Sequence, residues 1–179
     1  MTTLALTAVM DAGCADDAPP PTTLPAVTPS ASAGPAEVAA PEVPVEAMAE
    51  TAQGASAFLR FYFEQVNLAY ALGSTSVVMA LSADECNSCS NVIQDVERLT
   101  GSGSSVSGRR FIVSTVATAP AQADGSFIVD FRYSSDPYVE ISESGEVADE
   151  QPAQVDQDAQ ARLVHDDGAW RLLGLRLVS

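Results

Sequence analysis

The sequence contains no lysine, and basic residues of any kind are scarce. All 8 basic residues are arginine, they stand against 24 acidic residues, and the formal net charge at pH 7 is −16. Phosphate backbones and anionic lipid surfaces repel a chain of that charge, because the proteins that bind them do so through clustered basic side chains. We therefore expect no nucleic-acid partner and no electrostatic attachment to a lipid surface.

Long apolar runs are lacking as well, since none approaches the roughly 18 residues needed to span a bilayer. The chain instead opens on a short apolar segment, "MTTLALTAVMDAGC", which ends at Ala12-Gly13-Cys14. This pattern is typical of a bacterial lipoprotein signal peptide, which is cleaved before a cysteine that then carries lipid. Asp11 and the absence of an early basic residue depart from the pattern, so a disordered leader with an incidental cysteine is the alternative. We expect a signal peptide over residues 1–14, lipid on Cys14, and the membrane as a partner through that lipid.

Aromatic residues are absent from the next segment. Residues 15–45 hold 8 of the 11 prolines, among alanine, threonine, serine and glutamate. Such a composition cannot bury a core, and it predicts a disordered, extended tether. Together with the signal peptide, the tether indicates a domain held off the outer face of the cytoplasmic membrane, in the cell envelope. The folded domain is expected over residues 46–179.

The folded part begins with helical periodicity and ends with strand periodicity. Apolar residues recur every three or four positions up to Gly73, then in a shorter helix up to Leu81, and again between Val92 and Leu99. After a loop rich in glycine and serine the period becomes two, which predicts strands over residues 109–118, 126–134, 138–142, 157–165 and 169–178. This order predicts an α+β fold, with three N-terminal helices packed on one face of a curved, mostly antiparallel sheet of four to six strands.

Three stretches carry a family resemblance: "GASAFLRFYFEQVNLAYALGST", "LSADECNSC" and "DDGAWRL". They resemble an actinobacterial lipoprotein family of unknown function, whose domain is similar to the nuclear-transport-factor-2-like (SnoaL-like) cone. The resemblance implies that fold and a location in the cell envelope. It supplies no catalytic residues, and we expect no cofactor and no bound metal.

The inner surface of the predicted sheet offers candidate pocket-lining residues. In residues 126–134 aromatic and apolar side chains alternate with polar ones. The aromatic face is therefore expected against the helices, with Asp130 and Arg132 outside as solvated cross-strand side chains. The candidates to line a pocket in the cone, or else to fill the core, are Tyr62, Tyr70, Phe131 and Tyr133. These residue types do not specify the small-molecule ligand of such a pocket.

Two functional classes follow from these residues. The single histidine, His165, lies at the end of a predicted hairpin, where it is expected to be exposed with no second catalytic group fixed beside it. That position disfavours general-base chemistry. We therefore expect a non-catalytic binding or interaction domain. The alternative is a small-molecule isomerase or cyclase that uses the cone pocket, with a carboxylate beside a tyrosine.

The outer face of the predicted sheet is expected to be apolar at four positions, namely Ile112, Val116, Ile128 and Val164. Several aliphatic side chains on one sheet face favour a covered surface over one open to solvent. We therefore predict contact with a twin domain, which would give a homodimer, or with another envelope protein.

The pair Cys86 and Cys89 has three interpretations. A structural zinc site needs four ligands, and the chain has no second Cys-x-x-Cys and only 1 His. A thioredoxin-like redox motif follows a strand, whereas this pair lies between two predicted helices. With Cys14 assigned to lipid, the other two cysteines remain as a pair in an oxidising compartment. We predict a structural disulfide that clamps the second helix to the third, with a redox role as the alternative.

Overall fold

The structure is a computed structural model that describes residues 42–178. The expected signal peptide, Cys14 and residues 15–41 of the expected tether lie outside the described residues. Within the described range, the helices are η1 (Val45–Ala47), α1 (Ala52–Leu72), α2 (Ser76–Ala80) and α3 (Asn87–Gly101). They precede β1 (Ser105–Ser107), β2 (Ile112–Thr118), β3 (Phe127–Ser135), β4 (Tyr138–Ile141), β5 (Val147–Gln151), β6 (Gln154–Asp166) and β7 (Ala169–Leu177). The predicted order of three α-helices before the strands is confirmed.

Helix α1 forms because its sequence supplies both caps and an apolar side. The Thr51 hydroxyl accepts a hydrogen bond from the Gly54 N–H at 3.0 Å, which satisfies one of the free donors at the helix start. Gly73 ends the helix in the left-handed conformation, with φ 67°. Between these caps the apolar side buries Phe58 and Tyr62 in the core. None of the described helices is both long enough and apolar enough to cross a membrane.

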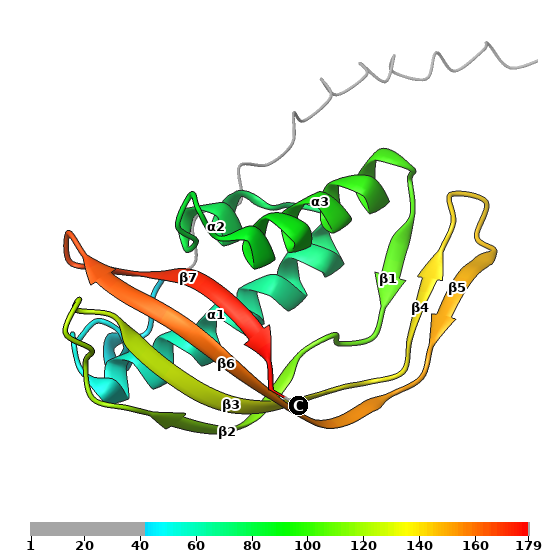
Figure 1. The fold of residues 1–179 in the computed structure, drawn as a ribbon. Helices are drawn as coiled ribbons and strands as arrows, with labels where there is room; N and C mark the ends of the chain where they lie inside the picture. Colours follow the sequence, from blue (N-terminus) through cyan, green and yellow to red (C-terminus); the bar gives the residue numbers. More distant parts are fainter. Residues whose placement is uncertain (1–41, 179) are drawn as a thin grey trace, which may run out of the picture. The chain divides into compact units, whose positions relative to one another are not determined.

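Two antiparallel sheets replace the single curved sheet expected from the sequence. Strands β2-β3-β6-β7, in that order, form a four-stranded sheet, and β1-β4-β5 form a three-stranded one. Figure 1 shows the helices over one face of the four-stranded sheet and the three-stranded sheet beyond its end. The core lies between the helices and the four-stranded sheet, where Phe127, Val129 and Phe131 of β3 are buried. The α+β class is confirmed, and the single continuous sheet is corrected to two.

The division between the sheets lies where three chain segments pass from one sheet to the other. These links, β1–β2, β3–β4 and β5–β6, contain Gly108, Pro137 and Pro152 respectively. Proline has no N–H to donate, so Pro137 and Pro152 interrupt the ladder of hydrogen bonds between the β3–β6 pair and the β4–β5 pair. Gly108 has φ 102°, and a Cβ at this position would lie 2.5 Å from the carbonyl oxygen of Pro137. These three residues therefore divide what would be one long bent sheet.

Two strands of the smaller sheet were not predicted. β1 lies in the stretch that was expected to be a loop of glycine and serine, and β5 lies in the acidic segment that was also expected to be a loop. Serine, aspartate and glutamate have low strand preference, so the sequence pattern favours a loop at both places. The segments are strands because both pair with β4, as in Val106 opposite Glu140 and Val139 opposite Glu150.

A β-bulge in β2 corrects the expected outer face. Val113 lies opposite Tyr133, but the register then shifts, so that Val116 lies opposite Phe131. An extra residue in one strand reverses the alternation of side chains from that point on. Val116 therefore packs against the core and not on the outer face. Contact of the outer face with a twin domain or an envelope protein stays a prediction.

Candidate functional site

The space between helices and sheet, where a pocket was expected, is filled by aromatic side chains. Tyr62 is fully buried, and the ring of Phe131 packs against that of Phe63 at a centroid distance of 5.2 Å. Phe58 stacks on Trp170 at 6.2 Å. In the described part of the chain, the candidates Tyr62 and Phe131 are thus core residues.

The other two candidate pocket residues lie elsewhere. Tyr133 is half-buried near the end of β3, and Tyr70 lies near the end of α1, where its hydroxyl donates to Asp95. Burial raises the pKa of Tyr133, and burial raises the pKa of Tyr62 against the opposing effect of a hydrogen bond with Ser82. These phenols are protonated at neutral pH. The structure does not bring the four candidates together in one cavity.

The side chains of Asp130 and Arg132 are exposed on the face of β3 opposite the helices, as the alternation predicts. Each has a partner across the sheet on β6. The Gln160 side-chain amide donates to Asp130 Oδ1 at 2.7 Å, and Arg132 Nε donates to Asp158 Oδ1 at 2.9 Å. Both residues therefore have the expected solvated cross-strand partners, and neither faces the interior.

His165 is not exposed, which corrects the expectation for a hairpin end. Its side chain is only 11% exposed, and its ring meets that of Trp170 edge-on at 4.9 Å. Nδ1 lies 3.7 Å from the Glu50 carboxylate, in the segment that precedes α1. The ring is covered because Trp170 is its partner in the β6–β7 register and the chain before α1 crosses beside it. His165 lies against a core aromatic and one exposed carboxylate, with no tyrosine hydroxyl among its contacts within residues 42–178.

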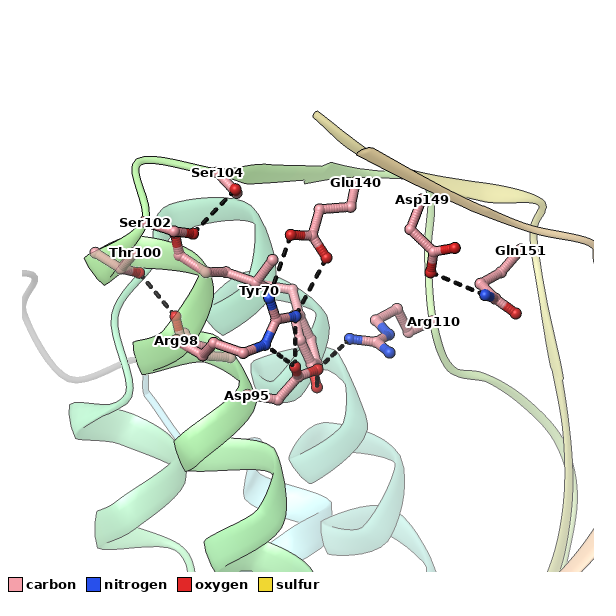
Figure 2. A network of polar contacts seen from close by, with 12 residues as sticks. Tyr70, Asp95, Arg98, Thr100, Ser102, Ser104, Arg110, Glu140, Asp149 and Gln151 are labelled. Carbon is pink, nitrogen blue, oxygen red and sulfur yellow. Dashed lines mark hydrogen bonds and ion pairs between the residues drawn. The ribbon is translucent and has the colours of Figure 1, made fainter. Parts of the chain in front are cut away.

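A polar network joins the helices to the small sheet, and Figure 2 shows it from close by. Arg110, just before β2, lies with its guanidinium over the ring of Tyr70 at 4.3 Å and over that of Tyr138 at 4.7 Å. Its Nη1 donates to Asp95 Oδ2 at 2.6 Å. A cation between two aromatic rings and a carboxylate is held by stacking and charge together. The arginine thus connects α1, α3 and β4.

A second arginine extends this network. Arg98 Nη2 donates to Asp95 Oδ1 at 2.9 Å, and the same guanidinium reaches the Glu140 carboxylate on β4 at 3.2 Å. Tyr70 adds a hydrogen bond to Asp95 at 2.9 Å. The sequence analysis singled out Tyr70 as a candidate pocket residue and did not predict the network. The signal that could have led to the network is the pair of adjacent arginines at 109–110, which holds two of the chain's 8 basic residues.

The electrostatics of this network oppose acid–base chemistry. Burial alone would raise the pKa of Asp95, but hydrogen bonds from Arg110, Arg98 and Tyr70 outweigh it, so the pKa is lowered from its ordinary value. Burial is also the main cause that raises the pKa of Tyr70. A carboxylate with a lowered pKa is a weak base, and a phenol with a raised pKa is a weak acid. The arrangement fits a structural cross-link.

The structure joins Cys86 and Cys89 by a disulfide, with a Cα–Cα distance of 5.3 Å. Cys86 caps the start of α3, and Cys89 lies in its first turn. The bond therefore closes the first turn of α3, and the expected clamp between the second and third helices is corrected, because the loop after α2 ends at Cys86. Both cysteines are fully buried, whereas a catalytic thiol must be accessible. This burial favours the structural interpretation.

Within residues 42–178, no group of three or more histidine, cysteine, aspartate or glutamate side chains is placed to hold a metal ion.

Several solved structures resemble the fold at low sequence identity. The intermembrane-space region of the chloroplast protein ARC6 superposes with a TM-score of 0.54 at 9% identity, over 72% of this chain and 96% of that one. Aln2 from a Streptomyces species gives 0.41 at 13% identity, over 67% and 83%. An uncharacterized protein from Caulobacter vibrioides with a cystatin-like fold gives 0.42 at 12% identity, over 68% and 87%. The likeness to the first of these shows a shared fold alone.

Among proteins with curated descriptions, none matches the sequence. A family of unknown function, DUF6318, matches residues 26–176, which include most of the expected tether and nearly all of the described fold. On this match, the chain belongs to the DUF6318 family of unknown function.

Proposed function

We propose that this protein is a lipid-anchored cell-envelope protein that displays a small, non-catalytic binding or interaction domain. In this proposal, residues 1–14 are the signal peptide, residues 15–45 the tether and residues 46–179 the domain. The domain is a nuclear-transport-factor-2-like cone. A helical layer over strongly bent antiparallel strands supports that assignment.

The observation that carries the non-catalytic proposal is the filled interior. The rings of Phe58, Phe63 and Phe131 fill the space between the helices and the four-stranded sheet, where the sequence predicted a pocket. An isomerase or cyclase of this type needs a titratable group beside a tyrosine in an apolar pocket. Here Tyr70 and Asp95 form such a pair, but two arginines hold the carboxylate, and it lies outside the aromatic core. The arrangement supports a binding module over an enzyme.

Lipid anchoring is tested by replacing the cysteine at the end of the signal peptide. Cys14→Ser should move the protein from the membrane fraction to the medium, or leave it as an unprocessed precursor, because the lipid on Cys14 is the proposed anchor. The matched control is the double variant Cys86→Ser with Cys89→Ser, which removes the other two thiols and should stay in the membrane fraction. A Cys14→Ser protein that is still processed and still in the membrane fraction would contradict the proposal.

The binding role is tested by native mass spectrometry of the full chain extracted gently from its own membrane. A small molecule or partner protein that stays bound supports the proposal. Repeated preparations without any bound species would count against it.

A further inference from the structure

A hollow of about 510 Å³ lies on the side of the four-stranded sheet that faces away from the helices. Its floor contains Ile128 of β3, which alternates with the buried Phe127 and Val129 and so points outward. Neighbouring strands contribute Arg162 of β6 and Gly174 of β7, which lie opposite each other in the register. The hollow is therefore separate from the filled interior.

Gly174 opens this hollow and has no packing reason to be glycine. A Cβ built on it would meet no atom within 4 Å, and its backbone is not among the positive-φ glycines. Glycine inside a strand weakens the strand, and it often marks a β-bulge or the close approach of a ligand or another backbone. Gly174 adjoins a bulge, because the register passes from Leu172 opposite Leu163 to Gly174 opposite Arg162. A side chain would fit at Gly174 without a steric or conformational cost, so the glycine leaves open a space that a larger residue would fill.

The charge of the hollow is opposite to that of the chain. It is lined by two arginines, Arg162 and Arg176, and one carboxylate, Asp124, in a chain of net charge −16. Asp124 forms an ion pair with Arg162. Arg176 forms no ion pair with any Asp or Glu side chain of residues 42–178, although acidic residues outnumber basic ones threefold. The Gln160 side chain lies opposite Arg176, and its amide donates to Asp130 on the same face of the sheet.

We propose that this hollow binds a small organic anion that carries an apolar portion. Its carboxylate or phosphate head lies on Arg176, and its hydrocarbon portion covers Ile128 in the space left by Gly174. This inference rests on the proposed binding function and names the ligand class and the site. The site is on the outer face, so the filled interior does not bear on it.

The test is a titration of the isotopically labelled full chain carrying Cys14→Ser, followed through its backbone amide resonances. The probes are hexanoate, hexyl phosphate, acetate and hexanol at constant ionic strength. Hexanoate, hexyl phosphate or both should shift the amides of Ile128, Gln160 and Gly174 saturably. Acetate should bind more than about tenfold more weakly than hexanoate, since each fully buried methylene adds roughly fourfold in affinity. A preference between the two six-carbon anions distinguishes a carboxylate ligand from a phosphate ligand.

Three variants locate the site. Gly174→Val fills the hollow and should weaken binding more than about tenfold, while its melting temperature stays equal or rises because β-branched residues favour strands. Arg176→Gln should weaken binding to a similar degree. Arg171→Gln is the matched control, because Arg171 is exposed on the same strand but does not line the hollow, and it should bind as the wild type does.

Two results would overturn the proposal: hexanol binding as tightly as both six-carbon anions, or a folded Gly174→Val variant with wild-type affinity. If either occurs while native mass spectrometry still finds a bound species, the site is wrong and the proposed binding function stands.

Discussion

Arg110 links the helices to the small sheet through two aromatic rings and one ion pair. It stacks between two tyrosines and pairs with Asp95. Arg110→Ala should lower the free energy of unfolding by about 1–3 kcal/mol, because the stacking and a partly buried ion pair are lost together. Arg110→Lys should recover only part, since an ammonium lacks the planar group that stacks. Urea unfolding measures both variants.

Arg109 is the matched control for this prediction. It adjoins Arg110, but its side chain is 63% exposed, and its ion-pair partner within residues 42–178 is the exposed Asp136. Exposed ion pairs contribute roughly 0–1 kcal/mol, so Arg109→Ala should change the free energy of unfolding by no more than that. Equal losses in the two alanine variants would mean that the network adds nothing beyond surface charge.

Asp95 should make the stability of the domain depend on pH in the acid range. Burial by itself would raise the pKa of Asp95, but the hydrogen bonds from the two arginines and Tyr70 have the larger effect, so the pKa lies below its ordinary value of 3.8. A lowered folded-state pKa gives stability that is complete above the unfolded pKa and is lost as the pH falls through the folded one. The difference in unfolding free energy between wild type and Asp95→Asn should therefore shrink from about pH 6 to about pH 2. A difference that stays constant across urea titrations at these pH values would contradict this assignment.

At the scale of elements, Gly108 is the residue in the bend between the two sheets where a side chain has the least room. Gly108→Ala should destabilise the domain by more than the roughly 1–2 kcal/mol that a left-handed conformation costs an alanine, because its Cβ would also press on the Pro137 carbonyl. Gly125→Ala is the control, since that glycine has φ 78° but open space around it. Thermal or urea unfolding compares the two, and equal losses would show that the close approach to Pro137 is not a constraint.

The disulfide also acts on a single element, because it closes the first turn of α3. Replacing Cys86 and Cys89 together by serine should leave the domain folded and cost about 1–2 kcal/mol, since a loop this small restricts the unfolded chain little. Calorimetry measures the lower melting temperature. The structural interpretation would fail if the wild-type protein catalysed disulfide exchange well above the rate of a simple dithiol.

Helices and long strands could be predicted because each carries its own periodicity. The end of α1 at Gly73 and the outward side chains of Asp130 and Arg132 follow from local sequence alone. β1 and β5 could not be predicted this way, since their residues become strands only through pairing with β4. The β-bulge after Val113 was missed for a similar reason, because a single extra residue leaves no mark in the period of a short strand.

At the scale of the whole molecule, the sequence predicts class and order but not the contacts between distant segments. Arg98 and Glu140 meet across 42 residues of chain, and Arg110 and Tyr138 across 28. No local pattern encodes these meetings, so the network could not be derived from the sequence. The same holds for the interior, since side-chain types did not reveal whether the aromatic residues line a pocket or fill it.

The central proposal is that the domain is held outside the cell by a lipid on Cys14, with its other two cysteines oxidised. Intact and fragment mass spectrometry of the protein purified from its native membrane tests both parts in one measurement. We predict a chain that begins at Cys14 with a diacylglycerol group, and a fragment containing Cys86 and Cys89 that lacks two hydrogens. An unmodified Cys14 still preceded by residues 1–13, or free thiols at both other cysteines, would contradict the account.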